Sequence, residues 1–401
     1  MMKPSFRILK TVGKARLGQL LTAHGVIETP SFFFCATKAA LKGADLQTLH
    51  RVQTPVLLAN TYHLMLQPGA PRIAAAGGLQ GFMGWKGPTF TDSGGYQIFS
   101  LGHGSVHEEL KGKSRPQGRL KITEEGAFFY SYRDGSPWYL SAEKSIEVQQ
   151  ALGADCIFTL DECTPFHVST EYTAQAMRRS HRWAQRCLDA FNDPTAQYHR
   201  SYQGLYGISQ GGIYPELRQE STEFLNQTEF FGHGIGGSLG TCKTQMYEVV
   251  ESALQGLCPE RPIHLLGIGG IEDILYGVSQ GIDTFDCVAP TRLGRHGGAL
   301  IRPYYWQTAL EPFHPRESIN LLKACFTEDD RPIDDQCLCP TCQNHSRAYL
   351  HHLFKAKEST GGTLLVTHNM FFMNQLMKEI RQAIEQENLE VLSKKWLARL
   401  A

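Results

Sequence analysis

Short apolar runs rich in β-forming residues recur along this 401-residue chain, and each ends in a polar or glycine-rich turn. Both faces of these runs are apolar, which is typical of strands buried on both sides of a parallel sheet. Enough residues separate successive runs for a crossover helix. The sequence therefore predicts an α/β protein whose eight strands close into a (β/α)8 TIM barrel. The expected strands are 31–35, 56–59, 89–91, 156–160, 206–209, 234–235, 263–266 and 284–285.

Composition places the chain among globular proteins, with 42% hydrophobic residues, and excludes collagen, coiled coils and wholesale disorder. The 39 Lys and Arg residues balance 39 Asp and Glu residues, so a nucleic-acid partner must bind a local patch. No run approaches the roughly 18 apolar residues of a membrane helix, and residues 1–17 lack a signal peptide's apolar core. Eleven scattered cysteines fit a reducing compartment. We expect a soluble, cytoplasmic protein with no membrane partner.

The alternation of strands and helices breaks after residue 302. Beyond it come a segment with tyrosines and a tryptophan, a stretch rich in Pro, His and Asp, and a dense cysteine cluster. From about Met370 onward, apolar positions recur at helical spacing. We expect three units: a barrel over 1–302, a zinc-binding subdomain inserted over 303–369, and a C-terminal helix over 370–401 that completes the barrel.

The cysteine cluster provides three soft ligands within six residues, Cys337, Cys339 and Cys342. Three thiols so close together are typical of a tetrahedral zinc site that one more side chain completes. Four protein ligands would make the site closed, and therefore structural rather than catalytic. The candidates for the fourth ligand are His345, His351, His352 and His368, of which spacing alone favours His345 or His351.

Polar turns follow the expected strands, and in a β/α barrel these turns converge at the carboxyl ends of the strands. Three of them carry an aspartate: Asp92, Asp161 and Asp286. Each aspartate alone is more often part of a turn or helix cap than of a catalytic site. Together they favour a functional site, because like charges held close need a function or a cation.

Signatures of a nucleotide cofactor fail on inspection. Two glycine-rich turns have Leu239 and Glu272 where the third glycine of a dinucleotide fingerprint belongs. His107 stands where the first glycine of a phosphate-binding loop belongs. We expect no nucleotide cofactor.

Two arginines, Arg292 and Arg295, follow Asp286 by six and nine residues. Two surface arginines would be an ordinary finding. Because they follow Asp286 on the same loop, they are also well placed to bind phosphate groups. These phosphates would flank the group that the Asp286 carboxylate attacks, if that carboxylate is a nucleophile.

With these residues laid out, the chain resembles the tRNA-guanine transglycosylase family from about Gly13 to its C-terminal helix. The motifs are Gly13-Lys14-Ala15-Arg16, Asn60-Thr61-Tyr62-His63-Leu64, Asp92-Ser93-Gly94-Gly95-Tyr96-Gln97, Asp161-Glu162-Cys163-Thr164-Pro165, Gln210-Gly211-Gly212, Gly236-Gly237, Phe285-Asp286-Cys287-Val288 with both arginines, and the cysteine cluster. The resemblance implies a barrel with a zinc subdomain, commonly a homodimer, that acts on the tRNA anticodon stem-loop. The implied reaction replaces the wobble guanine of GUN anticodons by a 7-deazaguanine base, without ATP.

The resemblance also implies roles for individual residues. Asp286 matches the nucleophile that forms a covalent glycosyl-enzyme, and Asp92 matches the general acid/base. At the positions that bind the polar edge of the base in the family, this chain has Asp161, Gln210 and the Gly237 amide, and at those that contact its two faces it has Tyr96 and Leu266. The pocket positions are Cys163 and Ser238, and the RNA-binding positions are Gly267, Arg292 and Arg295. His368 matches the fourth zinc ligand. Lys355 and Lys357 are further candidates for the RNA-binding face.

One segment departs from the bacterial pattern of the family, namely Ser238-Leu239-Gly240-Thr241-Cys242. Gly240 stands where bacterial members have a bulky residue and eukaryotic members a glycine, and the glutamate that follows is missing. This favours queuine as the incoming base, whereas Cys163 is the bacterial residue and favours the aminomethyl precursor. Both bases therefore remain open.

Two alternative functions also follow from the resemblance. A non-catalytic tRNA-binding subunit would not need Asp92 and Asp286, which this chain retains. An archaeal-type enzyme that acts on the tRNA D-arm usually carries added C-terminal RNA-binding domains, for which a chain ending at Ala401 has no room.

Overall fold

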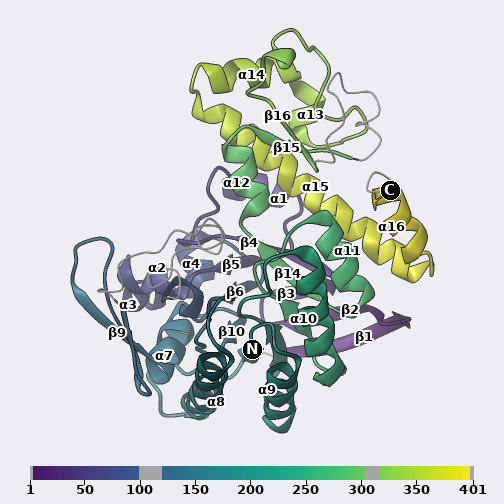
Figure 1. The fold of residues 1–401 in the computed structure, drawn as a ribbon. Coiled ribbons are helices and arrows are strands. Elements are labelled where there is room, and N and C mark those ends of the chain that lie inside the picture. Colours follow the sequence, from purple (N-terminus) through teal and green to yellow (C-terminus); the bar gives the residue numbers. More distant parts are fainter. Residues whose placement is uncertain (1–2, 99–119, 303–316, 398–401) are drawn as a thin grey trace.

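A computed structural model describes residues 3–98, 120–302 and 317–397. Within these residues, eight parallel strands form a closed barrel in the order β10-β11-β12-β13-β14-β4-β5-β6, which confirms the predicted fold class (Figure 1). The strands are β4 (Ser31–Cys35), β5 (Leu57–Ala59), β6 (Thr89–Thr91), β10 (Cys156–Phe158), β11 (Gly204–Ser209), β12 (Gly232–Ile235), β13 (Ile263–Leu265) and β14 (Thr284–Cys287). All eight predicted runs are strands, with ends that differ by up to two residues.

Alternate strand residues fill the inside of the barrel with large aromatic side chains. The Phe33 and Phe90 rings lie 4.6 Å apart, and the Phe90 and Tyr206 rings 5.7 Å apart. Leu20 and Ile27 of the antiparallel strands β2 (Ala15–Thr22) and β3 (Gly25–Thr29) belong to the same buried cluster. With β1 (Ser5–Val12), these strands form a sheet that packs against the barrel interior.

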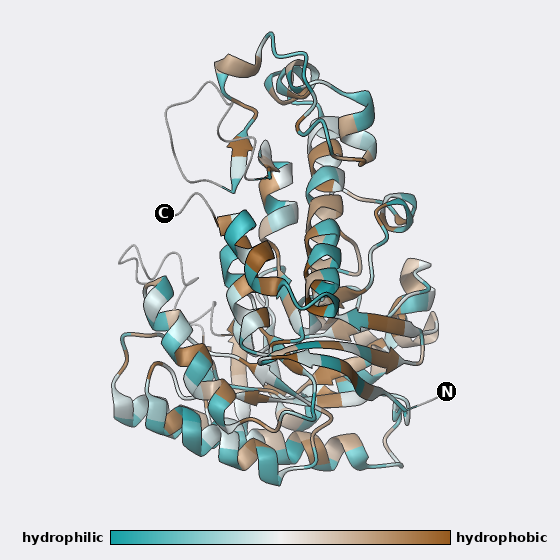
Figure 2. Cartoon of the chain, turned by 90° about the vertical axis from the view of Figure 1, so that its right-hand side faces the viewer, coloured by the Kyte–Doolittle hydropathy of each residue, from teal (hydrophilic) through white to brown (hydrophobic). Residues whose placement is uncertain are grey.

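The helices cover the outside of the barrel and expose their polar faces, so that both hydropathy colours recur along them (Figure 2). Ser141 and Ser169 cap α7 and α8 by accepting the amide protons of Lys144 and Tyr172. The helices are α1 (Leu46–Arg51), α2 (Thr61–Leu66), α3 (Ala70–Ala75), α4 (Gly78–Met83), α7 (Ala142–Leu152), α8 (Thr170–Asn192), α9 (Pro215–Gln227), α10 (Lys243–Gly256), α11 (Ile271–Ser279) and α12 (Ala289–Arg295). None in the described part is long and apolar enough to cross a membrane.

A second antiparallel sheet is inserted between β6 and α7. Its strands are β7 (Leu120–Ile122), β8 (Gly126–Tyr130) and β9 (Pro137–Ser141), and one of its faces exposes aromatic side chains. Neither antiparallel sheet was expected, because a search for runs that are apolar on both faces misses strands with one solvated face.

The C-terminal part lies at one end of the molecule, and one long helix runs from it to the barrel beside α12 (Figure 1). It contains β15 (Gly298–Leu300), β16 (Ser318–Asn320), a 3-10 turn (Ala324–Phe326), α13 (Pro340–Asn344), α14 (Arg347–Lys355) and the start of α15 (Ser359–Glu385). The second half of α15 packs Met373, Leu376 and Ile380 into the hydrophobic core outside the barrel strands, which also contains Phe32 and Phe34. The last helix of the described residues is α16 (Leu389–Leu397). The units 1–302, 303–369 and 370–401 remain a proposal, in which α15 belongs to both the second and the third.

Candidate active site

The three predicted aspartates come together at the carboxyl end of the barrel. Asp92 directly follows β6, Asp161 lies shortly after β10, and Asp286 is the third residue of β14. Burial raises the pKa of both Asp92 and Asp161; Asp286 adds to the rise at Asp92, and Asp92 adds to the rise at Asp161. The three carboxyl groups therefore interact electrostatically, on the one rim where the sequence places them.

Asp286 is held from below by the barrel interior. Its register partner is Phe33 of β4, which lies in the cluster inside the barrel, so the Asp286 side chain is also on the inner face of the barrel. Oδ1 accepts the Gly267 amide proton at 2.9 Å and lies 3.1 Å from His264 Nε2. Among the described residues, Oδ2 has only the weak thiol donor of Cys35, at 3.6 Å. One carboxylate oxygen is therefore fixed, and the other faces a weak donor.

His264 was not predicted as a site residue. It is fully buried, its ring lies against those of Phe33 and Phe158, and its Nδ1 is 2.9 Å from the Thr284 hydroxyl oxygen. The alternation of side chains along strands could have indicated it. His264 pairs with Thr284, and Asp286 lies two residues after Thr284 on the same face, so His264 and Asp286 both point into the barrel. A polar residue facing into an otherwise aromatic barrel marks the neighbourhood of the site.

Asp92 is held by donors from the segment that follows β5 and from the helical turn that follows Asp92 itself. The Asn60 side-chain amide, the Thr61 backbone amide at 2.8 Å and the Gln97 side-chain amide at 2.8 Å all donate to its carboxylate. Burial nevertheless dominates and raises the pKa of Asp92 to about 6, while these hydrogen bonds act to lower it. A carboxyl group with a pKa near neutrality is suited to both accept and return a proton.

Asp161 makes close contacts with the glycine-rich loops that carry Ser93 and Gln210. Its carboxylate accepts from Gln210 Nε2 at 2.5 Å and from the Ser93 hydroxyl at 3.2 Å, and burial raises its pKa to about 6. A Cβ at Gly95 would stand 2.4 Å from Asp161 Oδ1, and a Cβ at Gly237 would stand 2.3 Å from Gln210 Oε1. Glycine is required at both positions, because any side chain would displace the polar groups of the pocket.

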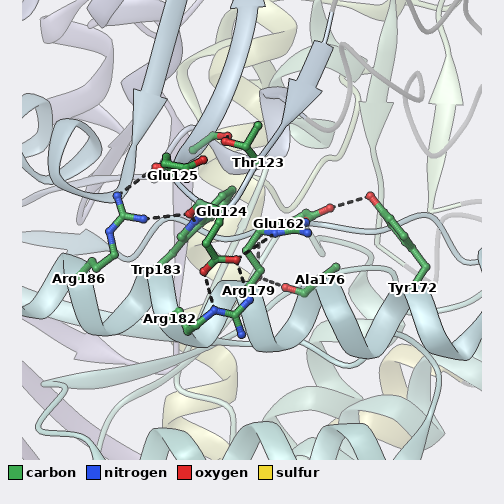
Figure 3. A network of polar contacts seen from close by, with 12 residues as sticks. Thr123, Glu124, Glu125, Glu162, Tyr172, Ala176, Arg179, Arg182, Trp183 and Arg186 are labelled. Carbon is green, nitrogen blue, oxygen red and sulfur yellow. Dashed lines mark hydrogen bonds and ion pairs between the residues drawn. The ribbon is translucent and has the colours of Figure 1, made fainter.

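A polar network anchors the loop that carries Asp161 (Figure 3). Glu162 is buried, forms an ion pair with Arg179 and accepts the Tyr172 hydroxyl proton at 2.8 Å. Its backbone amide donates to the Ser180 hydroxyl at 2.9 Å. All three partners belong to α8, so this helix fixes the position of the loop between β10 and α8.

The other predicted pocket residues lie at the same end of the barrel. Tyr96 is 49% exposed on the helical turn after Asp92, and Leu266 follows β13. Cys163 is partly buried on the Asp161 loop, and Ser238 is buried after β12. That Tyr96 and Leu266 contact the two faces of the substrate base remains a proposal.

The predicted RNA-binding residues fall into two regions. Arg292 and Arg295 occupy the last turn of α12, which begins right after β14; Arg292 is exposed, and burial lowers the pKa of Arg295. Gly267 directs its amide to Asp286 and has open space where a side chain would be. Lys355 and Lys357 are exposed at the end of α14, in the C-terminal part.

A buried cluster of three cysteines and one histidine forms the core of the C-terminal part. The Sγ atoms of Cys337, Cys339 and Cys342 lie 3.8, 3.4 and 3.3 Å from His368 Nδ1. His368 Nε2 lies 2.8 Å from the Leu300 carbonyl oxygen, so the proton on Nε2 leaves the Nδ1 lone pair facing the thiols. These four side chains are arranged to bind a metal ion.

The spacing argument for the fourth ligand was wrong. His351 instead points its Nδ1 at the Leu321 carbonyl oxygen, 2.7 Å away, and His345 stacks on Tyr349. Sequence spacing could not show that α15 brings His368 back to the cysteines, because the return depends on tertiary packing. The residue that the family resemblance implied is the one in the cluster.

Comparisons with known proteins agree with these motifs. The family model described as queuine tRNA-ribosyltransferase matches residues 11–401. A queuine tRNA-ribosyltransferase of Roseiflexus sp. (strain RS-1) is 43% identical over 96% of each chain. One from Thermus thermophilus is 42% identical over 95% of this chain and 90% of its own. A putative queuine tRNA-ribosyltransferase of Archaeoglobus fulgidus is 40% identical over 98% of each chain.

Proposed function

The chain belongs to the queuine tRNA-ribosyltransferase family, pentosyltransferases that exchange a guanine base of tRNA, and from this premise we propose how its residues perform the exchange. The enzyme is a tRNA-guanine transglycosylase of queuosine modification that acts on tRNA with a 7-deazaguanine base. Its target is the wobble guanine of GUN anticodons, in the anticodon stem-loop. The observation that carries the mechanism is the set of interacting carboxyl groups of Asp92, Asp161 and Asp286.

Asp286 is the nucleophile in this mechanism. Its less restrained oxygen, Oδ2, attacks C1′ of the ribose, the bond from C1′ to guanine N9 breaks, and guanine leaves with the bonding electron pair. The product is a glycosyl ester of Asp286 within an intact RNA backbone. Gly267 and His264 hold the other oxygen and so orient the carboxylate for attack.

Asp92 is the general acid/base of the mechanism. It protonates the departing guanine and then takes the N9 proton of the incoming base. That base attacks C1′ and releases the Asp286 carboxylate. Two displacements at one carbon retain its configuration, as in retaining glycosidases. A pKa of about 6 supports both proton transfers, because neither protonation state of Asp92 is strongly disfavoured near neutral pH.

The base is recognised along its polar edge. The Asp161 carboxylate accepts from the imino and amino groups, while Gln210 and the Gly237 amide donate to the carbonyl oxygen. Adenine would leave the buried carboxylate without donors, which discriminates against it. Tyr96 and Leu266 contact the two faces of the flipped base, and Cys163 and Ser238 complete the pocket.

The incoming base is queuine or its aminomethyl precursor. Gly240 has a φ of +99°, and a Cβ there would stand 2.4 Å from Gln245 Oε1. Gln245 therefore occupies the space that the glycine leaves, and its flexible side chain would have to move for the larger base. This geometry supports the precursor as readily as queuine.

The Cys3His cluster binds Zn²⁺ in this proposal, one ion per subunit. Cys337, Cys339, Cys342 and His368 are a donor set that zinc prefers, and four protein ligands leave no position for a reactant. The ion would be structural. Arg292 and Arg295, with Lys355 and Lys357, would bind tRNA phosphates. We further propose a homodimer that acts on cytoplasmic tRNA without a nucleotide cofactor.

The test is base exchange with unmodified GUN-anticodon tRNA and three labelled bases: guanine, the aminomethyl precursor and queuine. The parent enzyme should incorporate label, and Asp286→Asn should not, with its affinity for tRNA retained. The preferred base decides between queuine and the precursor. Binding of tRNA without exchange of any base would instead support the alternative of a non-catalytic tRNA-binding subunit.

A further inference from the structure

Arg218 is a fully buried arginine that the mechanism above does not use. It lies in α9, directly behind the two loops that carry Gln210 and Gly237. Its hydrogen-bond partners in the described part of the chain are backbone carbonyl groups only. Burial lowers its pKa to about 10, so the guanidinium still carries its charge at neutral pH.

The contacts of Arg218 join the two loops. Nε donates to the Gly212 carbonyl at 2.9 Å, on the Gln210 loop. Nη1 donates to the Gly236 carbonyl at 2.9 Å and to the Ser209 carbonyl at 3.0 Å, and Nη2 donates to the Ser238 carbonyl at 3.3 Å. One planar guanidinium therefore fixes the relative position of both loops.

The Gly236 contact has an electronic consequence. The Gly236 carbonyl and the Gly237 amide belong to one peptide group. A cation bound to the carbonyl draws electron density from this group, so the N–H on its other side becomes a stronger donor. Gly237 N–H is the donor proposed above for the carbonyl oxygen of the base.

Negative charge develops on guanine as its bond to C1′ breaks, and part of that charge resides on the carbonyl oxygen. Donors aimed at a developing charge in a site without water contribute strongly to catalysis. We propose that Arg218 is a positioning residue that polarises the Gly236–Gly237 peptide, so that the Gly237 amide stabilises the charge on the departing base. This proposal rests on the base-exchange function proposed above.

A purely architectural role explains the observations less well. Neutral donors such as an amide side chain would satisfy carbonyl groups without the cost of burying a charge. Gly211 lets the start of α9 approach the Gln210 loop, because a Cβ there would stand 2.8 Å from the backbone nitrogen of Arg218.

The experiment compares guanine with 6-thioguanine, which keeps the imino and amino donors but offers sulfur, a weak acceptor, in place of the carbonyl oxygen. Inhibition constants of both bases and kcat for guanine exchange are measured for the parent and for Arg218→Gln. We expect kcat to fall about tenfold or more. Guanine affinity should fall about tenfold, while 6-thioguanine affinity should change less than about threefold. Parallel weakening of both bases would overturn the proposal.

Arg261→Gln is the matched control. Arg261 also donates to two backbone carbonyls, those of Leu225 and Thr228, but at the C-terminal end of α9, the end opposite to Arg218. It should leave the ratio of the two inhibition constants unchanged, and a changed ratio would contradict the proposal.

Arg218→Lys keeps the test decisive if the glutamine variant does not fold, because lysine retains the charge but cannot reach all four carbonyls. It should give an intermediate ratio, and an equal loss for both bases would again overturn the proposal. If the parent enzyme itself exchanges no guanine, the proposed function fails. If the parent exchanges guanine and the ratio never changes, this inference alone fails.

Discussion

The ionisation of Asp92 connects the burial of one residue to the pH dependence of the whole reaction. The acid form of Asp92 must be present to protonate the departing guanine, and the carboxylate form of Asp161 must be present to accept from the base. Because burial raises the pKa of both groups to about 6, activity should be bell-shaped in pH with its maximum near this value. The two groups interact, so both limbs report the pair rather than either residue.

The variant Asp92→Asn tests the role of this carboxyl group in catalysis and, separately, its effect on the free energy of unfolding. It should lower kcat by about 10² to 10⁴. The parent carboxyl group has a folded-state pKa above its unfolded value, so its contribution to stability is fully present below pH 3.8 and is lost as pH rises through 6. The stability of the variant relative to the parent should therefore increase between pH 4 and pH 7 in urea titrations. A pH-independent difference would contradict the raised pKa.

His264 should act on the reaction only through Asp286. Replacement by leucine removes the contact with Oδ1 and leaves the Thr284 hydroxyl without its partner. We expect kcat to fall about tenfold, because the carboxylate is less well oriented, with little change in KM for tRNA. An unchanged kcat in steady-state exchange assays would show that Gly267 alone orients the nucleophile.

At the scale of elements, α8 determines where Asp161 stands. Glu162→Gln breaks the buried ion pair with Arg179 that anchors the loop between β10 and α8. We expect a loss of roughly 3 kcal/mol in the free energy of unfolding, together with weaker base binding. Glu147→Gln is the control, since its ion pair with Lys144 is exposed and should contribute at most about 0.5 kcal/mol. Urea titration checks both. Equal losses would show that the Glu162 network does not anchor the loop.

The barrel strands were predictable because their residues are buried on both faces. Phe33 fills the barrel while Phe32 and Phe34 face the helices, so the run Ser31–Cys35 reads as apolar throughout. The antiparallel strands escape the same criterion: in β8, Phe128 and Tyr130 are exposed while Phe129 is buried. Strands with one solvent-exposed face are recognised by alternating buried and exposed positions, whereas strands buried on both faces are recognised by a continuous apolar run.

The candidate site was predictable where chemistry and position coincide, and not where a residue acts at a distance. Asp92, Asp161 and Asp286 end strands, and their side chains are the reactive type. His264 lies within β13, and Arg218 lies in the first turn of α9, three residues after Pro215. Neither residue is in a turn that follows a strand, so neither position indicated a role. Their importance depends on which loops and strands the closed barrel places beside them.

At the scale of the molecule, α15 couples the Cys3His cluster to the barrel. His368 contributes to the cluster, while Met373 and Ile380 of the same helix lie in the hydrophobic core that includes the outward-facing residues of the barrel strands. Removal of the metal by a chelator, or the change Cys339→Ser, should lower the melting temperature of the whole protein and weaken tRNA binding. Metal analysis and thermal denaturation check this. A cluster that loses its metal with no change in melting temperature would contradict the coupling.

The most direct test of the central claim is to look for the bond between Asp286 and the ribose. The enzyme is incubated with labelled unmodified tRNA in the absence of added base, denatured, and separated by denaturing electrophoresis. A glycosyl ester on Asp286 should give a band of protein joined to RNA, which disappears when guanine is supplied and is absent with Asp286→Asn. Peptide mass spectrometry should place the ribose on Asp286. A linked band that persists in Asp286→Asn, or active enzyme that forms none, would contradict the account.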